Sequence, residues 1–315
     1  IHEDEKFGPD YFLPTDAYLE TCAAVGAGFF SQRMNQLTCN ARYMDEVERV
    51  LYNNVLTGVS LSGDKYTYQN PLNTDKPDRW EWHVCPCCPP MFLKIMAAMP
   101  GYIYAYQGDN VYVNLFIGSE VRIPVGDNSV RLKQLTSYPW HGAVSIQVNP
   151  DKASTFSMKV RIPGWAQGTE NPYNLYQSNL KAPVKLKVNQ EDVLLRIVDG
   201  YAEINREWKK GDHIELELPM QPRLITANKA VENLRGQVAL ASGPIIYCFE
   251  DADNPELQTF KLQAQTPLEL SHDSNLLNGV NIIKCQGDIP AKAIPYYAVA
   301  NREESHSYKV WIPQK

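Results

Sequence analysis

The residues with the clearest potential for chemistry lie in WHVCPCCPP, residues 82–90, where Cys85, Cys87 and Cys88 are clustered. The chain has seven cysteines in 315 residues, and an odd count excludes a framework in which every cysteine is paired. Neighbouring cysteines rarely bond to each other, because a disulfide requires Cα atoms about 4.4–6.8 Å apart with suitably directed Cβ atoms. The cluster therefore favours metal ligation, with buried packing or a disulfide as the alternatives.

A second set of ligand-type residues lies upstream in Glu20-Thr21-Cys22. Zinc takes four ligands from Cys, His, Asp or Glu, and a spacing of two residues allows both side chains to reach one ion from an extended or cap-like turn. Glu20, Cys22, Cys87 and Cys88 would complete such a site without a histidine. His83 is close enough in sequence to be a ligand, but a packing or supporting role is favoured for it.

Three cysteines, Cys39, Cys248 and Cys285, have no ligand-type neighbours at short spacing. Isolated cysteines behave mainly as small apolar side chains, so we expect these three to fill the core.

A carboxylate among sulfur ligands is unusual for a purely structural zinc site, so one thiolate could have a second role. A metal-bound thiol is held deprotonated and is then a nucleophile. Such a nucleophile needs an acid to protonate its leaving group, and the segment HEDEKFGPDYFLP offers Glu3, Asp4 and Glu5. For each of these carboxylates taken alone, an ordinary solvated charge is the default interpretation.

The elements that would position these residues are helices in the first hundred residues. Apolar residues recur at helical spacing in residues 20–37 and again in 41–56, and a third short helix is expected over 91–99, stopped by Pro100-Gly101. The short CNAR connection favours an antiparallel helical hairpin. The first helix is predicted to bury one face that contains Val25, Phe29, Phe30, Met34 and Leu37. The second is predicted to bury Tyr43, Val47, Val50, Leu51 and Leu56.

From Tyr102 onward the apolar period changes from helical to alternating, in short runs separated by Gly, Asp, Asn and Pro. This pattern is typical of antiparallel β-sandwiches, and some two hundred residues of it exceed one module. We place a boundary near ANKAVENLRGQ, which divides the chain into residues 1–101, 102–228 and 229–315. Residues 167–185 are less patterned and are expected to form an excursion on one sheet edge. The fold class is therefore α+β and multidomain.

Composition limits the partners. The formal net charge is −6 and no cluster of Lys and Arg stands out, so a nucleic acid partner is not expected. No run approaches the roughly 18 apolar residues of a membrane helix, which argues against membrane insertion. The amino terminus IHEDEKFGPD lacks the features of a signal peptide, which does not decide the compartment.

Several motifs together resemble one enzyme family. They are E-x-F-G-x-D-Y-x-L-P at residues 5–14, A-Y-x-E-T-C-A-A-x-G at 17–26, C-x-C-C-P-P at 85–90 and VRIPGWA at 160–166. In combination they are similar to the β-L-arabinofuranosidase family of glycoside hydrolases, over most of the chain. The resemblance implies part of an (α/α) toroid in residues 1–101, followed by two antiparallel β-sandwich modules. It also implies a Zn²⁺ site made by Glu20, Cys22, Cys87 and Cys88.

The resemblance assigns catalytic roles as well. It implies that Cys87 is the nucleophile, that Glu5 is the general acid/base, and that Tyr68 lines the sugar pocket. The expected reaction is a retaining double displacement that releases L-arabinofuranose, or a related furanose, from β-linked glycans. Most retaining glycosidases use a carboxylate nucleophile, so a cysteine would be an exception.

Members of this family are about twice as long as this chain. The resemblance therefore implies that helices which close the pocket come from a missing N-terminal half or a companion polypeptide. A bacterial cytoplasm or periplasm is compatible with a sugar-harvesting role, although the sequence does not fix the compartment. The alternative function is a non-catalytic carbohydrate-binding or scaffolding β protein, a fragment of the enzyme, in which zinc is structural.

Overall fold

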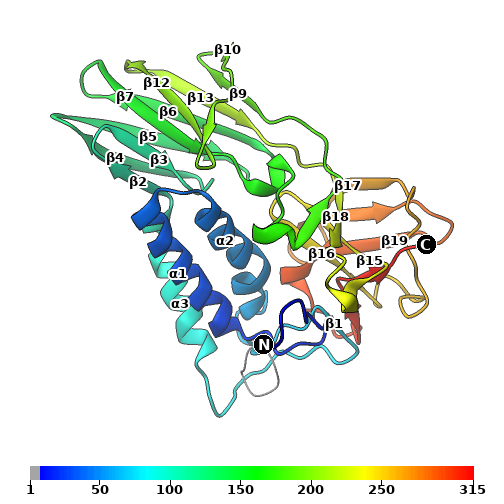
Figure 1. Ribbon diagram of the computed structural model, residues 1–315. Helices are drawn as coiled ribbons and strands as arrows, with labels where there is room; N and C mark the ends of the chain where they lie inside the picture. The colour runs from blue at the N-terminus through cyan, green and yellow to red at the C-terminus, as the bar shows by residue number, and fades with distance from the viewer. Residues whose placement is uncertain (1–7) are drawn as a thin grey trace.

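The structure, a computed structural model, describes residues 8–315 and consists of a small helical region followed by three β-sheets (Figure 1). The α-helices of this part of the chain are α1 (Thr21–Thr38), α2 (Arg42–Val50) and α3 (Cys88–Ala98). In Figure 1 they lie together on one side of the molecule, below the sheets of the middle region.

Helices α1 and α2 form the predicted helical hairpin, with Cys39 in the left-handed conformation at the end of α1. The predicted buried face of α1 is partly wrong. Val25 is buried, but Phe30 is 64% exposed and Leu37 is 79% exposed. The buried face instead uses Gly28, where an added Cβ would lie 3.1 Å from Ile95 Cδ1 of α3. Small residues allow the helices to approach closely, and hydrophobicity alone does not predict this face.

Helix α2 is shorter than predicted and continues as a π-helix over Leu51–Val55 and a 3-10 turn over Leu56–Gly58. Val47 and Leu51 are buried as predicted. The change of helix type alters which side chains face the core, so Leu56 is only half-buried. Helix α3 ends with a 3-10 turn over Met99–Tyr102, where Pro100 and Gly101 were expected to stop it.

The middle region contains two sheets. One has the strand order β11-β12-β7-β3-β2 and the other β10-β9-β13-β6-β5-β4. The bounds are β2 (Tyr104–Gln107), β3 (Asn110–Val113), β4 (Ser119–Val125), β5 (Asn128–Thr136), β6 (Ala143–Pro150), β7 (Ser154–Arg161), β9 (Lys185–Val188), β10 (Glu191–Asp192), β11 (Ile197–Val198), β12 (Tyr201–Trp208) and β13 (Asp212–Glu217).

Alternation along these strands builds one shared core. Val144, Ile146 and Val148 of β6 are buried, and the residues between them are more exposed. Side chains from both sheets, such as Leu132 of β5 and Met158 of β7, belong to the same hydrophobic cluster. One pairing departs from the antiparallel prediction, because β3 runs parallel to β7. In the chain, β3 and β7 are separated by three strands that belong to the other sheet. No tight hairpin therefore forces β3 and β7 to be antiparallel.

The third sheet has ten strands and draws on every part of the chain. Its central order is β17-β18-β19-β16-β15-β14-β8, with β1, β20 and β21 attached. The bounds are β1 (Asn73–Thr74), β8 (Tyr176–Ser178), β14 (Arg223–Ala227), β15 (Gln237–Ser242), β16 (Ile245–Glu250), β17 (Leu268–Asp273), β18 (Val280–Cys285), β19 (Ala291–Pro295), β20 (Tyr308–Lys309) and β21 (Ile312–Pro313). The expected excursion over 167–185 does supply an edge strand, β8. Cys248 and Cys285 are buried in this region, as predicted, whereas Cys39 is only half-buried.

A buried group of charges, the Arg161 network, joins α2 to the middle region. The Arg161 side chain is fully buried; its Nη1 donates to Asp45 Oδ1 at 2.7 Å and its Nη2 pairs with Glu48. The Tyr138 hydroxyl donates to Glu48 Oε1 at 2.8 Å, and Trp165 Nε1 donates to Glu48 Oε2 at 3.3 Å. Because breaking such a buried pair strands a charge, the network holds the helices firmly on the β-structure.

The observed architecture confirms a mixed fold of a few helices and several sheets. No helix in residues 8–315 is both long and apolar enough to cross a membrane.

Candidate metal centre and active site

Four side chains predicted as ligands come together in space. One ligand atom from each of Glu20, Cys22, Cys87 and Cys88 lies within 4.8 Å of all the others. Cys22 Sγ is 3.5 Å from Cys88 Sγ, Cys87 Sγ is 3.9 Å from Cys88 Sγ, and Cys87 Sγ is 3.4 Å from Glu20 Oε1. All three cysteines are free thiols. We call these four residues the thiol cluster, and its donor set is one that can bind a metal ion.

Two helix N-termini converge on the thiol cluster. Glu20 is the N-cap of α1, and Cys87 is the N-cap of α3. Pro89 and Pro90 occupy the first turn of α3, where the missing proline N–H costs no helical hydrogen bond. The positive end of each helix dipole therefore faces the cluster.

The start of α1 is fixed by its contacts with residues 66–70. Thr21 N donates to Tyr68 O at 3.0 Å, and Thr21 Oγ1 donates to Thr67 O at 2.8 Å. Asn70 Nδ2 in turn donates to Thr21 Oγ1 at 3.0 Å. At Gly58 an added Cβ would lie 2.9 Å from Thr21 Cγ2, so a larger residue there would displace Thr21. These contacts keep Glu20 and Cys22, on either side of Thr21, directed toward Cys87 and Cys88.

The protein itself supplies little positive charge to the thiol cluster. Burial, together with the neighbouring thiols of Cys87 and Cys88, raises the pKa of Cys22 far above the ordinary value. Burial likewise raises the pKa of Cys88 to about 11. Within residues 8–315, no Lys or Arg makes an ion pair with Glu20. Burial therefore disfavours ionisation of the Cys22 and Cys88 thiols, and the donor set of the cluster is one that a metal ion can complete.

Aromatic rings form a wall beside the thiol cluster. The Tyr68 hydroxyl lies 3.9 Å from Cys87 Sγ, and its ring is stacked with Trp80 at a centroid distance of 5.8 Å. His83 stacks on Trp80 at 4.6 Å, and Tyr18 packs against Tyr68 at 6.0 Å. A hydrogen bond with Tyr18, followed by burial, raises the pKa of Tyr68, so its hydroxyl keeps its proton. A ring wall with a polar tip suits a ligand with both C–H and O–H groups.

The structure locates most of the site residues that were predicted from the sequence. The four predicted ligands and Tyr68 lie together, while Glu5 lies outside the described residues. His83 is not among the grouped ligand atoms and instead packs against Trp80, as was favoured. Sequence reasoning missed Tyr18 and Trp80. The first could have been found from its spacing, two residues before Glu20 in Tyr-Leu-Glu, but Trp80 offered no such signal.

The fold and the thiol cluster define a mixed α/β protein with a thiol-rich cluster that can hold a metal ion. Comparison with known families identifies it further. Residues 1–101 match the catalytic domain of the glycoside hydrolase family 127 β-L-arabinofuranosidases, residues 110–220 match the middle domain, and residues 222–313 match the C-terminal domain. The chain therefore belongs to glycoside hydrolase family 127, a family of β-L-arabinofuranosidases.

Individual relatives agree with this assignment. A non-reducing end β-L-arabinofuranosidase from Bifidobacterium longum subsp. longum is 31% identical, over 96% of this chain and 50% of its own length. A solved family 127 β-arabinofuranosidase is 35% identical with a TM-score of 0.93, over 100% of this chain and 52% of that one. A family 127 β-L-arabinofuranosidase from Geobacillus stearothermophilus T6 is 35% identical with a TM-score of 0.90, over 98% of this chain and 52% of its own. The chain thus spans about half the length of the relatives it matches.

Proposed function

We propose that this chain carries the metal site and nucleophile of a retaining glycoside hydrolase that releases L-arabinofuranose, or a related furanose, from β-linked glycans. The observation that carries the proposal is the thiol cluster, in which the Cys87 thiol lies between a carboxylate, two further thiols and the Tyr68 hydroxyl. Membership of glycoside hydrolase family 127 supports the reaction class.

We assign the ion as Zn²⁺, held by Glu20, Cys22, Cys87 and Cys88. At zinc's usual bond lengths, the corners of a tetrahedron are about 3.8 Å apart for two sulfurs and about 3.5 Å apart for a sulfur and an oxygen. The observed separations of 3.5 and 3.9 Å between sulfurs, and 3.4 Å between sulfur and oxygen, fit these values. When bound, zinc would supply the positive charge that keeps the cysteine ligands ionised.

Cys87 is the nucleophile in this proposal. Its side chain lies at the N-terminus of α3 and is only partly buried, so Sγ is the sulfur of the pair with access to a sugar, whereas Cys88 is buried. Attack of the Cys87 thiolate on the anomeric carbon forms a C–S bond and breaks the glycosidic C–O bond. Water then cleaves the C–S bond, and two inversions give net retention.

The remaining residues bind the sugar and move the proton. The Tyr68 hydroxyl, next to Cys87 Sγ, is placed to bind a sugar hydroxyl near the anomeric carbon, and the stacked Trp80 gives a face for the sugar's C–H groups. Glu5 is proposed as the general acid that protonates the departing oxygen and then as the base that activates water. Its place in the motif E-x-F-G supports this role.

We propose that residues 1–101 are part of an (α/α) toroid, and that 102–228 and 229–315 are two β-sandwich modules. The family matches over 1–101, 110–220 and 222–313 support this division. The exposed Phe30 and Leu37 of α1 and the 65% exposed Leu93 of α3 suit contact with further toroid helices. In this proposal those helices come from an N-terminal half or a companion polypeptide.

The test is covalent trapping on Cys87. The chain is combined with the N-terminal helical half that its longer relatives contain and is incubated with a β-L-arabinofuranoside that is turned over slowly. The protein is then digested, and its peptides are analysed by mass spectrometry. A pentosyl adduct on Cys87 is expected. Cys87→Ala should abolish both adduct and turnover, while Cys39→Ala, outside the thiol cluster, should leave both intact. Turnover by Cys87→Ala at an unchanged rate would contradict the proposal.

A further inference from the structure

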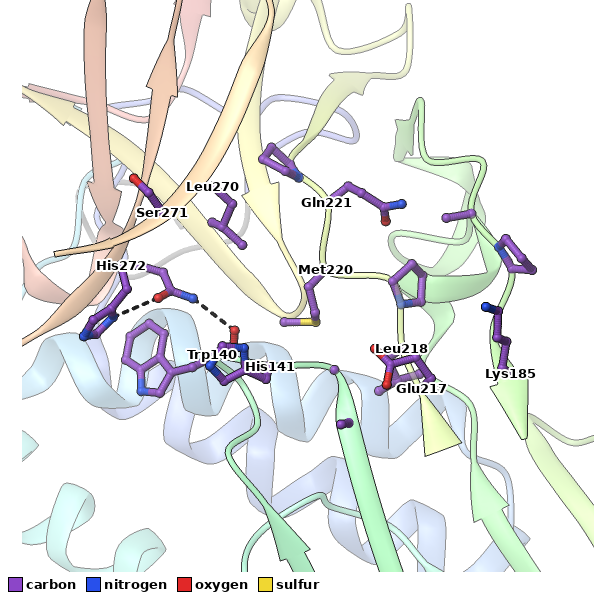
Figure 2. A pocket seen from close by; sticks show the side chains of 17 residues that line it. Trp140, His141, Lys185, Glu217, Leu218, Met220, Gln221, Leu270, Ser271 and His272 are labelled. Carbon is purple, nitrogen blue, oxygen red and sulfur yellow. Dashed lines mark hydrogen bonds between the residues drawn. The ribbon is translucent and has the colours of Figure 1, made fainter. Parts of the chain in front are cut away.

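A large cleft with a mixed polar and apolar lining lies where the middle region meets the ten-stranded sheet, and it shares no residue with the thiol cluster. Its volume is about 910 Å³, within the usual range for small-molecule sites. Its walls come from the turn between β5 and β6, the residues 182–185 that lead into β9, the end of β13 with the segment 218–222 that follows it, and the β17–β18 hairpin. In the view of Figure 2, Trp140 and His272 lie at one end, Lys185 at the other, and Met220 between them.

Trp140 is held in place at the wall of this cleft. Asn281 Nδ2, on β18, donates to Trp140 O at 3.0 Å. Tyr297 packs behind the indole at a centroid distance of 6.4 Å. The ring is half-buried, so it is supported by protein while still lining the cleft. A fixed aromatic face with an accessible side is a platform on which the C–H groups of a sugar ring can stack.

The same hydrogen bonds determine which atoms remain for a ligand. Because Asn281 Nδ2 is the donor to Trp140, Asn281 Oδ1 is the acceptor for His272 Nδ1, 3.0 Å away. The neutral His272 ring then carries its proton on Nδ1 and an unshared electron pair on Nε2. His272 is exposed, so Nε2 can accept a hydrogen bond from a ligand hydroxyl.

The charge of the cleft argues for a neutral ligand. Its formally charged lining residues within the described chain are Lys185 and Glu217, which are cross-strand neighbours on β9 and β13. Their charges cancel, so neither an anion nor a cation is strongly favoured. Together with the exposed amide of Gln221, they offer both donors and acceptors. One stacking face and mixed hydrogen-bonding groups without net charge match a polyhydroxylated neutral molecule.

We propose that this cleft is a second, non-catalytic carbohydrate-binding site, which takes a short neutral oligosaccharide stacked on Trp140 with a hydroxyl donated to His272 Nε2. It stands apart from the thiol cluster and does not depend on the catalytic role proposed there. Binding of a neutral glycan strand at this cleft would hold the protein on a polymeric glycan.

The test is calorimetric titration of the 315-residue chain with a short arabino-oligosaccharide, a xylo-oligosaccharide and, as an anionic probe, polygalacturonate. The chain carries Cys87→Ser to prevent turnover. Saturable binding of a neutral oligosaccharide is expected, and Trp140→Ala should weaken it by about tenfold, the equivalent of one stacked aromatic contact. Trp140→Phe, which keeps a ring, should recover most of the affinity. Tyr173→Ala, which removes a 94% exposed aromatic ring elsewhere, is the matched control and should bind normally.

His272→Ala and Gln221→Ala change exposed side chains and report on the cleft even if Trp140→Ala impairs folding. Each should weaken binding about threefold to tenfold, as expected for one hydrogen bond. Loss of binding in Tyr68→Phe instead would place the glycan at the thiol cluster and overturn this proposal while supporting the catalytic one. Equal affinity in Trp140→Ala and Tyr173→Ala, or binding of polygalacturonate alone, would also overturn it.

Discussion

The Arg161 network and the thiol cluster are both groups of ionisable side chains that are at least partly buried, but their charges are balanced in different ways. In the Arg161 network, Asp45 and Glu48 face a guanidinium, and two further donors satisfy Glu48. In the thiol cluster, four acidic groups face one another, and burial raises the pKa of Cys22 and Cys88. The charges of the first are balanced by the protein, whereas the second has no such counter-charge among the described residues and is a donor set that can hold a metal ion.

The largest effect on stability is expected when the Arg161 network is broken. Arg161→Met should lower the free energy of unfolding by about 3–5 kcal/mol, because it leaves two buried carboxylates without their counter-charge. The thiol cluster does not contact Arg161, so the metal content per folded chain should not change. Denaturant unfolding together with metal analysis would measure both.

Arg122→Met is the matched control, since Arg122 forms an ion pair with Asp151 on the surface. Both side chains are substantially exposed, so the change in stability should be below about 1 kcal/mol. A comparable loss in the two variants would show that the buried network has no special structural role.

A second prediction concerns metal binding by the thiol cluster. Cys88→Ser should lower metal affinity by at least about tenfold to a hundredfold, because a soft thiolate ligand is replaced by a weak one. Cys285→Ser is the matched control, since Cys285 is equally buried but isolated from the cluster. It should keep its metal even if it loses some stability. Equal metal loss in both variants would mean that destabilisation, and not ligation, explains the effect of Cys88→Ser.

The sequence predicted the thiol cluster more completely than the fold around it. Glu20 and Cys22, and likewise Cys87 and Cys88, are close in the chain, and the need for four donors joins the two pairs. The buried face of α1 was harder to predict because it depends on the close approach of Ile95 to Gly28. The cleft at Trp140 was not predictable, since its walls come from segments spread over residues 140–281 that meet only through tertiary packing.

The sequence also did not predict which strands belong to which sheet. The alternating patterns predicted most strands and the edge position of 167–185, but a pattern says which face is buried and not which partner covers it. Strands β1, β8 and β14 therefore join the ten-stranded sheet from earlier parts of the chain.

A smaller effect is expected at a second balanced group, where Arg302 Nη2 and Lys292 Nζ contact Asp253 at 2.6 and 2.5 Å. Burial raises the pKa of Asp253, but these hydrogen bonds and charges outweigh it, so the net pKa lies below the ordinary value. A depressed folded-state pKa stabilises the protein above the unfolded-state pKa of about 3.9, and the contribution is lost as the pH falls below that.

Asp253→Asn should therefore remove part of the loss of stability on acidification between about pH 5 and pH 3, by up to about 1 kcal/mol, because Asp253 is largely buried but its partner Lys292 is partly screened by solvent. Urea unfolding at several pH values across this range measures the slope of the free energy of unfolding against pH. Asp151→Asn, at the surface pair, is the comparison, and an unchanged slope in Asp253→Asn would contradict the account of this group.

Metal content and thiol reactivity, measured together on the purified, folded chain, test most directly whether a cation completes the thiol cluster. The account predicts one zinc ion per chain and thiols of Cys22, Cys87 and Cys88 that react with a thiol reagent only after a chelator is added. The exposed Cys85 should react before and after chelation and serves as an internal control. A folded chain without metal, with those three thiols equally reactive in both conditions or joined in a disulfide, would contradict the claim that the cluster is completed by a cation.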